Sequence, residues 1–162
     1  MNNIREILEK AAKAAADSIL TKRKDGLNIK EKSHKDLVTD CDIASEKAII
    51  SILSKAFPGS AFQSEEAGYK EGNNWLWVID PIDGTHNFIY GLPYYGISIG
   101  GVRENKFTVG LIYLPETKDC FFAYKNKGAY KNDKKIAVST RDKLEQAMMW
   151  NSNRALWKVW QD

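Results

Sequence analysis

The stretch of sequence that decides the fold is residues 77–101, which read WVIDPIDGTHNFIYGLPYYGISIGG. Its apolar start predicts a buried strand that delivers Asp80 to the strand end. Pro81 has a fixed φ and favours an extended backbone at the residue before it. Gly84 permits a tight turn. We therefore expect the carboxylates of Asp80 and Asp83, together with a backbone carbonyl of this turn, to point toward one place.

The chemistry of such a group has two interpretations. Converging hard oxygen ligands suit Mg²⁺ rather than a softer metal. On two carboxylates alone, however, an ordinary turn is an equally simple interpretation, because aspartate and glycine are common turn formers. Further acidic residues change the balance. Glu65 and Glu66 follow the preceding predicted strand, and Asp42 begins a predicted helix. Crowded like charges call for a cation, so the sequence favours a metal site.

Around this stretch the hydrophobic pattern predicts an α+β fold, in which two N-terminal helices pack on a mainly antiparallel β-sheet. The helices are expected at residues 3–20 and 40–56, with Thr39 or Asp40 as the N-cap of the second. The polar residues 27–35 are expected to be exposed. The apolar stripes of the helices are expected to be Ile4, Ile7, Leu8, Ala11, Ala15, Ile19 and Leu20, and Ile43, Ala44, Ala48, Ile49, Ile52 and Leu53. Strands are expected at residues 61–64, 75–79, 97–102, 107–114, 120–124 and 136–139.

The composition is that of a globular protein. The 162 residues are 43% apolar and 28% charged, and no apolar run is long enough to span a membrane. The first ten residues lack the apolar core of a signal peptide, and two cysteines make no disulfide framework. We therefore expect a cytoplasmic protein without a membrane partner. The net charge of +3 comes from scattered lysines, so a nucleic-acid ligand is not expected.

Three separated motifs resemble those of the inositol monophosphatase family. Residues 80–85 read DPIDGT and are followed by Asn87 and Phe88, as in the family signature. Residues 36–39 read DLVT, with Asp42 beyond them, and residues 64–66 read SEE. Because the three motifs occur in the order of the family, the resemblance is specific. It implies that the α+β unit is the N-terminal part of a sugar-phosphatase-like αβαβα fold.

The resemblance also implies a role for each site residue. The metal ligands would be the side chains of Glu65, Asp80 and Asp83 and the carbonyl of Ile82. The catalytic residues, which would orient and deprotonate the attacking water, would be Asp42 and Thr85. The substrate-binding residues would be Asp83, Gly84 and Thr85. Glu66 is left out of the metal set, because it would ligate through water or only support Glu65. The implied cofactor is Mg²⁺, with Mn²⁺ as a substitute.

The function implied in this way is a Mg²⁺-dependent phosphomonoesterase. It would hydrolyse inositol monophosphate, or a related sugar or alcohol phosphate, by means of a metal-activated water. We expect a small phosphate ester as substrate and a homodimer as the assembly. A 3′-nucleotide phosphatase or a histidinol-phosphate phosphatase is a close competitor, because the metal motif is shared.

We expect residues 1–140 to form the phosphatase domain and residues 141–162 to be a tail that starts a missing or altered C-terminal α/β half. Family members carry in that half a further metal-binding aspartate, in a Trp-Asp-x-Ala-Ala type motif that residues 141–162 do not contain. The 162-residue chain alone is therefore expected to be a poor phosphatase. The alternative is a weakly active or inactive remnant that acts as a scaffold for a protein or RNA.

Overall fold

The structure is a computed structural model that describes residues 2–33 and 36–148. Its helices are α1 (Asn2–Lys24), α2 (Asp40–Ala56) and α3 (Thr85–Ile89), with a short 3₁₀ helix at Leu144–Gln146. Its strands are β1 (Ile29–Ser33), β2 (Asp36–Thr39), β3 (Ala61–Ser64), β4 (Gly68–Lys70), β5 (Leu76–Asp83), β6 (Gly96–Arg103), β7 (Lys106–Leu114), β8 (Asp119–Tyr124), β9 (Gly128–Lys131) and β10 (Lys134–Ile136). The fold is therefore α+β, as predicted.

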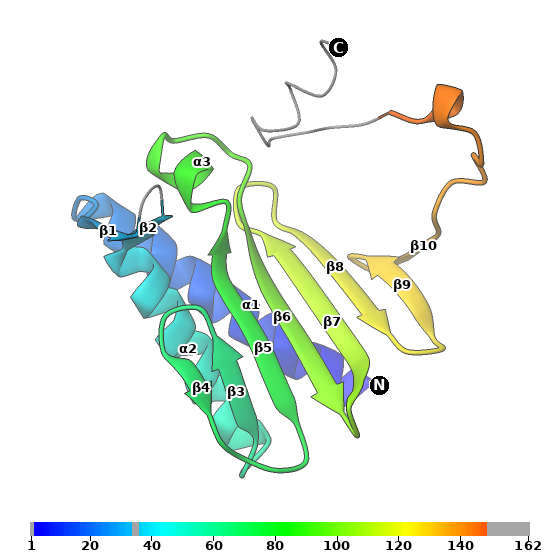
Figure 1. Cartoon of the computed structure of the whole chain (residues 1–162), viewed down its shortest axis with the longest axis horizontal. Helices are drawn as coiled ribbons and strands as arrows, with labels where there is room; N and C mark the ends of the chain where they lie inside the picture. The colour runs from blue at the N-terminus through cyan, green and yellow to red at the C-terminus, as the bar shows by residue number, and fades with distance from the viewer. Residues whose placement is uncertain (1, 34–35, 149–162) are drawn as a thin grey trace.

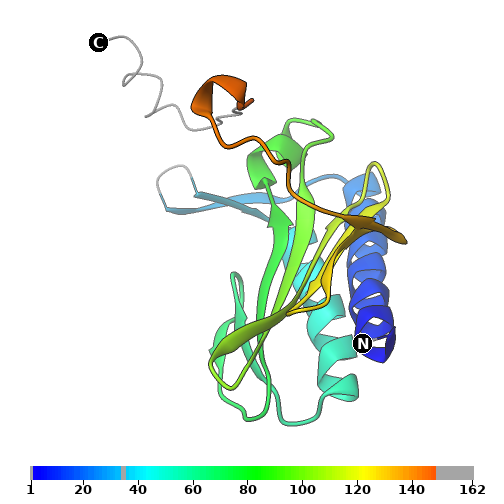
Figure 2. The same cartoon turned by 90° about the vertical axis from the view of Figure 1, so that its right-hand side faces the viewer.

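Eight of these strands form one mixed sheet in the order β10-β9-β8-β7-β6-β5-β3-β4. Every neighbouring pair is antiparallel except β3 and β5, which are parallel. Strands β1 and β2 form a separate hairpin. The two long helices cover one face of the sheet, and α3 and the hairpin lie near the end to which β5 points (Figures 1 and 2).

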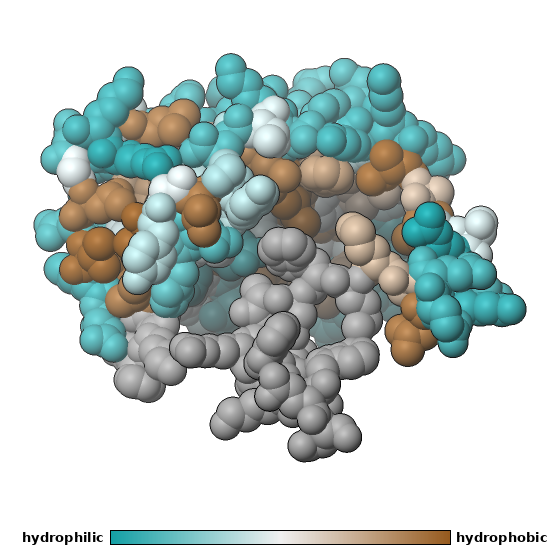
Figure 3. Space-filling view, turned by 90° about the horizontal axis from the view of Figure 1, so that it is seen from above, coloured by the Kyte–Doolittle hydropathy of each residue, from teal (hydrophilic) through white to brown (hydrophobic). Residues whose placement is uncertain are grey.

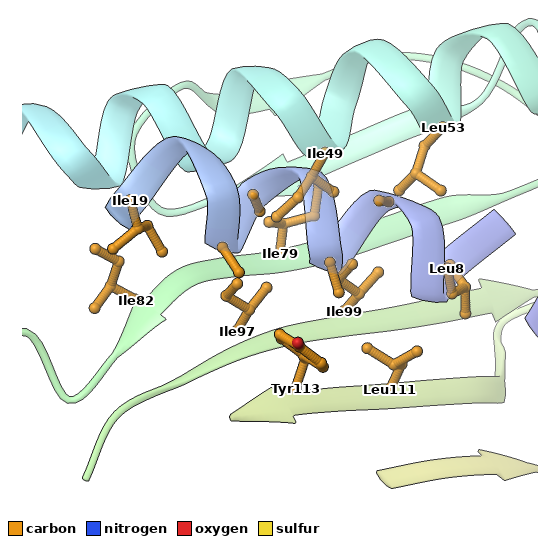
Figure 4. Close-up of a cluster of buried hydrophobic side chains, with 14 of the residues drawn as sticks. Leu8, Ile19, Ile49, Leu53, Ile79, Ile82, Ile97, Ile99, Leu111 and Tyr113 are labelled. Carbon is orange, nitrogen blue, oxygen red and sulfur yellow. The ribbon is translucent and has the colours of Figure 1, made fainter. Parts of the chain in front are cut away.

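The hydrophobic core fills the space between the two long helices and the sheet. Figure 4 shows side chains of α1 and α2 meeting those of β5, β6 and β7, with Ile19 and Ile82 close to each other. Ile82 belongs to the DPIDGT motif and is only 1% exposed. Burying an aliphatic side chain of this size contributes about 1.5 to 3 kcal/mol. The burial of Ile82 therefore fixes the backbone of the acidic motif against the core.

Several local predictions need correction. Leu20 and Ile43 were expected in the buried stripes, but each is 40% exposed. The side chain of Ile19 is buried in the core, so that of the next residue, Leu20, points away from it. Ile43 is exposed because polar residues occupy part of the inward face of α2. Residues 27–35 were expected to be exposed, and residues 28–31 are, but the segment also contains β1, a strand that was not predicted. The strand expected at residues 136–139 is instead β10, which ends at Ile136 opposite Ala129 in the short β9.

The predicted tail, residues 141–162, lies mostly outside the described residues. Residues 141–148 are exposed, and their only regular element is the 3₁₀ helix. The division of the chain at residue 140 stays a prediction. In the described part of the chain, no helix combines the length and the apolar character needed to cross a membrane.

Candidate metal centre

The two acidic motifs meet because their strands are parallel neighbours. Ser64 pairs with Ile79 at the end of the β3–β5 ladder. Glu65 is the next residue after β3, and Asp80 is the next residue of β5. In parallel strands the carboxyl ends lie at one edge of the sheet. Glu65 and Asp80 therefore come from adjacent positions at that edge, although fourteen residues of chain separate them.

A β-bulge brings the second aspartate of the motif to the same face. Asp80 pairs with Ser98 and Asp83 pairs with Gly96, so three steps on β5 match two steps on β6. In a regular strand, residues three apart point to opposite faces, and one extra residue cancels that alternation. Asp80 and Asp83 therefore share a face of the sheet. The prediction that the strand ends at Asp80 was wrong, because β5 continues through the bulge to Asp83.

The turn after the bulge depends on glycine. Gly84 has a φ of 94°, and a Cβ at this position would lie 3.0 Å from the carbonyl oxygen of Tyr94. Both facts make any other side chain strained there. Helix α3 starts at the next residue, Thr85, whose hydroxyl donates a hydrogen bond to the carbonyl of Ile82 at 3.0 Å. The expected turn at Gly84 is therefore confirmed, and it places Thr85 back over the bulge.

Asp42 belongs to the first turn of α2 and is 1% exposed. Its Oδ2 accepts two hydrogen bonds from Thr39, one from the backbone N–H at 2.7 Å and one from the hydroxyl at 2.6 Å. Thr39 is the N-cap of the helix, as predicted, and the pair forms a capping box. Burial raises the pKa of Asp42 above its ordinary value, although the bonds from Thr39 oppose that rise, and the charge of Glu65 adds to it.

The predicted pairing of Asp42 with Thr85 stays a prediction. Helix α3 lies beside β2, the strand that leads into α2, so the two residues belong to neighbouring segments. In the structure the hydrogen bonds of Asp42 come from Thr39, and the hydroxyl of Thr85 is bonded to Ile82.

Asp80 is the electrostatic centre of the cluster. Burial raises the pKa of its carboxyl to about 7, and the charges of Glu65 and Asp83 contribute to the rise. Its Oδ1 atom is buried and has no hydrogen-bond donor among the described residues. A buried carboxylate oxygen without a donor is costly. A cation at this position would satisfy that oxygen and offset the repulsion among the carboxylates.

The donor set suits a hard cation that keeps part of its water shell. Within residues 2–33 and 36–148, no group of three acidic, histidine or cysteine side chains could hold a metal ion by itself. Mg²⁺ is commonly bound through one or two carboxylates, with water and substrate phosphate completing its shell. The Asp80 carboxylate, with its buried Oδ1, fits that mode, and the carbonyl of Ile82 keeps a second lone pair beside its bond from Thr85. The full set of Glu65, Asp80, Ile82 and Asp83 stays a prediction.

Sequence reasoning missed two residues behind this cluster. Ser45 and Glu46 are 0% and 3% exposed, so the inward face of α2 carries polar groups where an apolar stripe was expected. Ser45 donates to the carbonyl of Pro81, and Glu46 accepts from the N–H of Glu66. Their spacing from Asp42, three and four residues along the helix, was the available signal.

A broad groove lies on the sheet face opposite the long helices. It measures about 720 Å³ and is lined mainly by β6, β7, β8 and β9, with Phe107 and Ile112 among its exposed apolar side chains. Ser98, which pairs with Asp80, lies at its margin. Seen from above, polar residues form much of the rim of the molecule, with apolar residues between them (Figure 3). The groove itself contains no acidic residue, so it is not the candidate metal centre.

A sequence profile of the inositol monophosphatase family matches residues 1–156. The chain belongs to this family. Among its relatives, the Nus factor SuhB of Pseudomonas aeruginosa is 36% identical over 155 residues, which cover 92% of this chain and 57% of the relative. A fructose-1,6-bisphosphatase/inositol-1-monophosphatase of Aquifex aeolicus is 37% identical over 153 residues, covering 91% of this chain and 58% of the relative.

The family fold is also found in solved structures. The crystal structure of the extragenic suppressor protein suhB from Bartonella henselae matches with a TM-score of 0.82 and 32% identity. The match covers 86% of this chain and 55% of that structure. The chain therefore spans a little over half the length of the relatives it matches.

Proposed function

We propose that this protein is a Mg²⁺-dependent phosphomonoesterase that acts on a small sugar or alcohol phosphate such as inositol monophosphate. The observation that carries the proposal is the buried, unpartnered Oδ1 of Asp80 within a cluster of carboxylates at one edge of the sheet. Family membership supports the reaction class, and relatives named as inositol and fructose phosphatases support the substrate class.

Mg²⁺, when bound, would supply positive charge to the phosphate and would lower the pKa of a coordinated water. Asp80 and Glu65 would hold the cation, with Asp83 and the Ile82 carbonyl beside them. The backbone N–H groups of Gly84 and Thr85 follow the bulge directly and would bind a phosphate oxygen. These groups act mainly by positioning and charge, which is what phosphoryl transfer requires.

Asp42 and Thr85 would handle the attacking water. The hydroxyl of Thr85 donates to the Ile82 carbonyl, so its lone pairs can accept a hydrogen bond from water and orient it. Burial raises the pKa of Asp42, which moves this carboxyl toward the range of a useful general base. Because both side chains are hydrogen-bonded to the backbone, little ordering is left for the reaction step.

The test is release of inorganic phosphate by the full chain, with and without Mg²⁺, compared with an EDTA blank. The panel contains inositol monophosphate, fructose 1,6-bisphosphate, a 3′-nucleotide and histidinol phosphate. Asp80→Asn should abolish the release. Glu104→Gln should not, because Glu104 follows the far end of β6, away from Gly96 and the bulge. Absence of both Mg²⁺ binding and Mg²⁺-dependent release would overturn the proposal.

A second function is favoured by the name Nus factor SuhB, which several of the relatives carry. In this alternative, which we also propose for testing, the chain is a scaffold that binds a protein or RNA, and its apolar groove belongs to the contact surface. The scaffold alternative predicts no Mg²⁺-dependent phosphate release. If the partner is RNA, a fluorescent RNA should bind, and its affinity should fall steeply as the salt concentration rises. If the partner is a protein, no RNA should bind.

A further inference from the structure

Helix α2 is bonded to both acidic motifs at once. Ser45 and Glu46 are consecutive residues of this helix, and both side chains are buried. The Ser45 hydroxyl donates to the carbonyl of Pro81 at 3.0 Å. Oε2 of Glu46 accepts from the backbone N–H of Glu66 at 2.9 Å. The first bond fixes the bulge between Asp80 and Asp83, and the second fixes the turn that carries Glu65.

Both hydrogen bonds are made by buried side chains. Burying a carboxylate is expensive unless it is hydrogen-bonded, and the bond from an N–H to a charged acceptor is about twice as strong as a neutral one. Pro81 has no N–H of its own and belongs to the bulge, where the regular ladder is interrupted. The Ser45 bond therefore supports the backbone at the point where the sheet supports it least.

The two loops need such support because their own pairing ends just before the ligands. The last β3–β5 pair is Ser64 with Ile79, and Glu65 begins the three-residue turn that leads to β4. Beyond that pair, Glu65 and Asp80 bring two acidic side chains to neighbouring positions, and like charges so placed repel each other in the absence of a cation. A loop held only at its strand end could move away and relieve the repulsion.

We infer that Ser45 and Glu46 are positioning residues that fix the distance between the Glu65 turn and the Asp80–Asp83 bulge, and so set the affinity for the divalent cation. This inference rests on the proposed function. Asp42, one helical turn earlier, is on the same face of α2. One turn of a rigid helix thus carries a candidate catalytic carboxylate and holds both candidate ligand loops.

The experiment measures Mg²⁺ affinity by calorimetry on the folded 162-residue chain. Glu46→Ala should weaken Mg²⁺ binding by about 10- to 100-fold, the usual effect of losing a group that orients a metal ligand. Glu46→Gln keeps an oxygen acceptor and should recover most of the affinity. In phosphate release, Glu46→Ala should raise the Mg²⁺ concentration needed for half-maximal turnover, while turnover at saturating Mg²⁺ should change much less.

A matched control separates positioning from stability. Ile49→Val shortens a buried side chain of the same helix and lowers stability, but Ile49 makes no polar contact with either loop. It should leave Mg²⁺ affinity unchanged. Hydrogen exchange of the Glu66 N–H gives a readout without metal. It should accelerate in Glu46→Ala and stay slow in Glu46→Gln and Ile49→Val.

If Glu46→Ala binds Mg²⁺ as tightly as the parent, the positioning role is wrong while the proposed function stands. If the parent itself neither binds Mg²⁺ nor releases phosphate, the proposed function fails and the positioning role falls with it. If Glu46→Ala does not fold, Ser45→Ala carries the same test through the Pro81 bond, and unchanged Mg²⁺ affinity in that variant would overturn the inference.

Discussion

Ser64 and Ile79 are parallel partners, and each is followed directly by an acidic residue of a family motif. This one pair explains why two short motifs that are separate in sequence form a single cluster. It also makes the cluster sensitive to changes in charge, because Glu65 and Asp80 are placed together by the backbone whether or not a cation is present.

The first prediction concerns metal binding. Asp83→Asn should weaken Mg²⁺ and Mn²⁺ binding sharply, because it removes a carboxylate that the bulge places on the same face as Asp80. Calorimetry on the purified chain measures the effect. Glu104→Gln, a change of the same kind in an exposed turn, should leave the affinity unchanged. Parent-like metal binding by Asp83→Asn would remove Asp83 from the ligand set.

The second prediction concerns Thr85. Thr85→Ala should bind metal as the parent does but lose about 10²-fold in turnover, the usual scale for a partner in acid–base chemistry. The hydroxyl is held by the Ile82 carbonyl, and alanine cannot orient a water molecule. Thr85→Ser should keep most of the activity. Phosphate release at saturating Mg²⁺ is the measurement, and unchanged turnover in the alanine variant would exclude Thr85 from the mechanism.

The third prediction concerns pH and the metal-free protein. Burial, with the charges of Glu65 and Asp83, raises the pKa of Asp80 to about 7, so the folded state keeps a proton that the unfolded chain releases. The stability from this group is complete below about pH 4 and is lost as the pH rises through about 7. In EDTA near pH 8, Asp80→Asn should therefore be more stable than the parent, by about 2 kcal/mol after solvent screening.

The same comparison near pH 4 is the control for the third prediction. Both proteins then carry an uncharged group at position 80, and their free energies of unfolding should agree. Denaturant unfolding at the two pH values measures the difference. An equal gain at both pH values would show that the Asp80 charge is not the cause.

The fourth prediction concerns the start of α2. Thr39→Ala removes the hydroxyl of the N-cap. That hydroxyl accepts a hydrogen bond from the backbone N–H of Cys41 and donates one to the carboxylate of Asp42. It should lower the free energy of unfolding by about 1 to 2 kcal/mol. Thr39→Ser keeps a hydroxyl at the same place and should recover most of the loss. Urea denaturation of the two variants measures this difference, and equal stability would contradict the capping role.

The fifth prediction concerns Gly84. Gly84→Ala puts a Cβ 3.0 Å from the Tyr94 carbonyl at a φ of 94°, so it should cost about 1 to 3 kcal/mol and displace Thr85. Gly110→Ala is the matched control, because a Cβ there meets nothing within 4 Å in the described structure. Thermal unfolding and phosphate release report the two effects. Wild-type behaviour of Gly84→Ala would show that the turn can adapt.

The sequence predicted the larger elements because their signals are strong. Residues 40–56 and 61–64 match α2 and β3 in full, since a capping threonine and a clear change of hydrophobic period mark their ends. The β1–β2 hairpin was missed because its strands have only five and four residues, and β1 reads IKEKS with a single apolar residue. Hydrophobic pattern has no information about such pairing.

The candidate site residues stay a prediction, and only their placement in the fold can be compared with the structure. The motif at residues 80–85 suggested converging oxygens, yet a turn and a bulge have the same sequence signal, and only the pairing with β6 distinguishes them. Ser45 and Glu46 were missed for a related reason. A search for apolar periodicity assigns polar residues to the surface. It therefore left the buried Ser45 and Glu46 out of the inward stripe of α2 and included the exposed Ile43 instead.

All the candidate ligands and the helix that supports them come from one stretch of chain, residues 40–83. Loop-closure entropy grows with the length of chain between contacts, so a site assembled from neighbouring segments closes at low entropic cost. Contacts of low sequence separation also form early in folding. We therefore expect the Glu65 turn and the end of β5 to meet early, so that the repulsion between their carboxylates acts on the folding chain as well as on the finished protein. We expect Mg²⁺ in the folding medium to relieve that repulsion before the whole chain is folded.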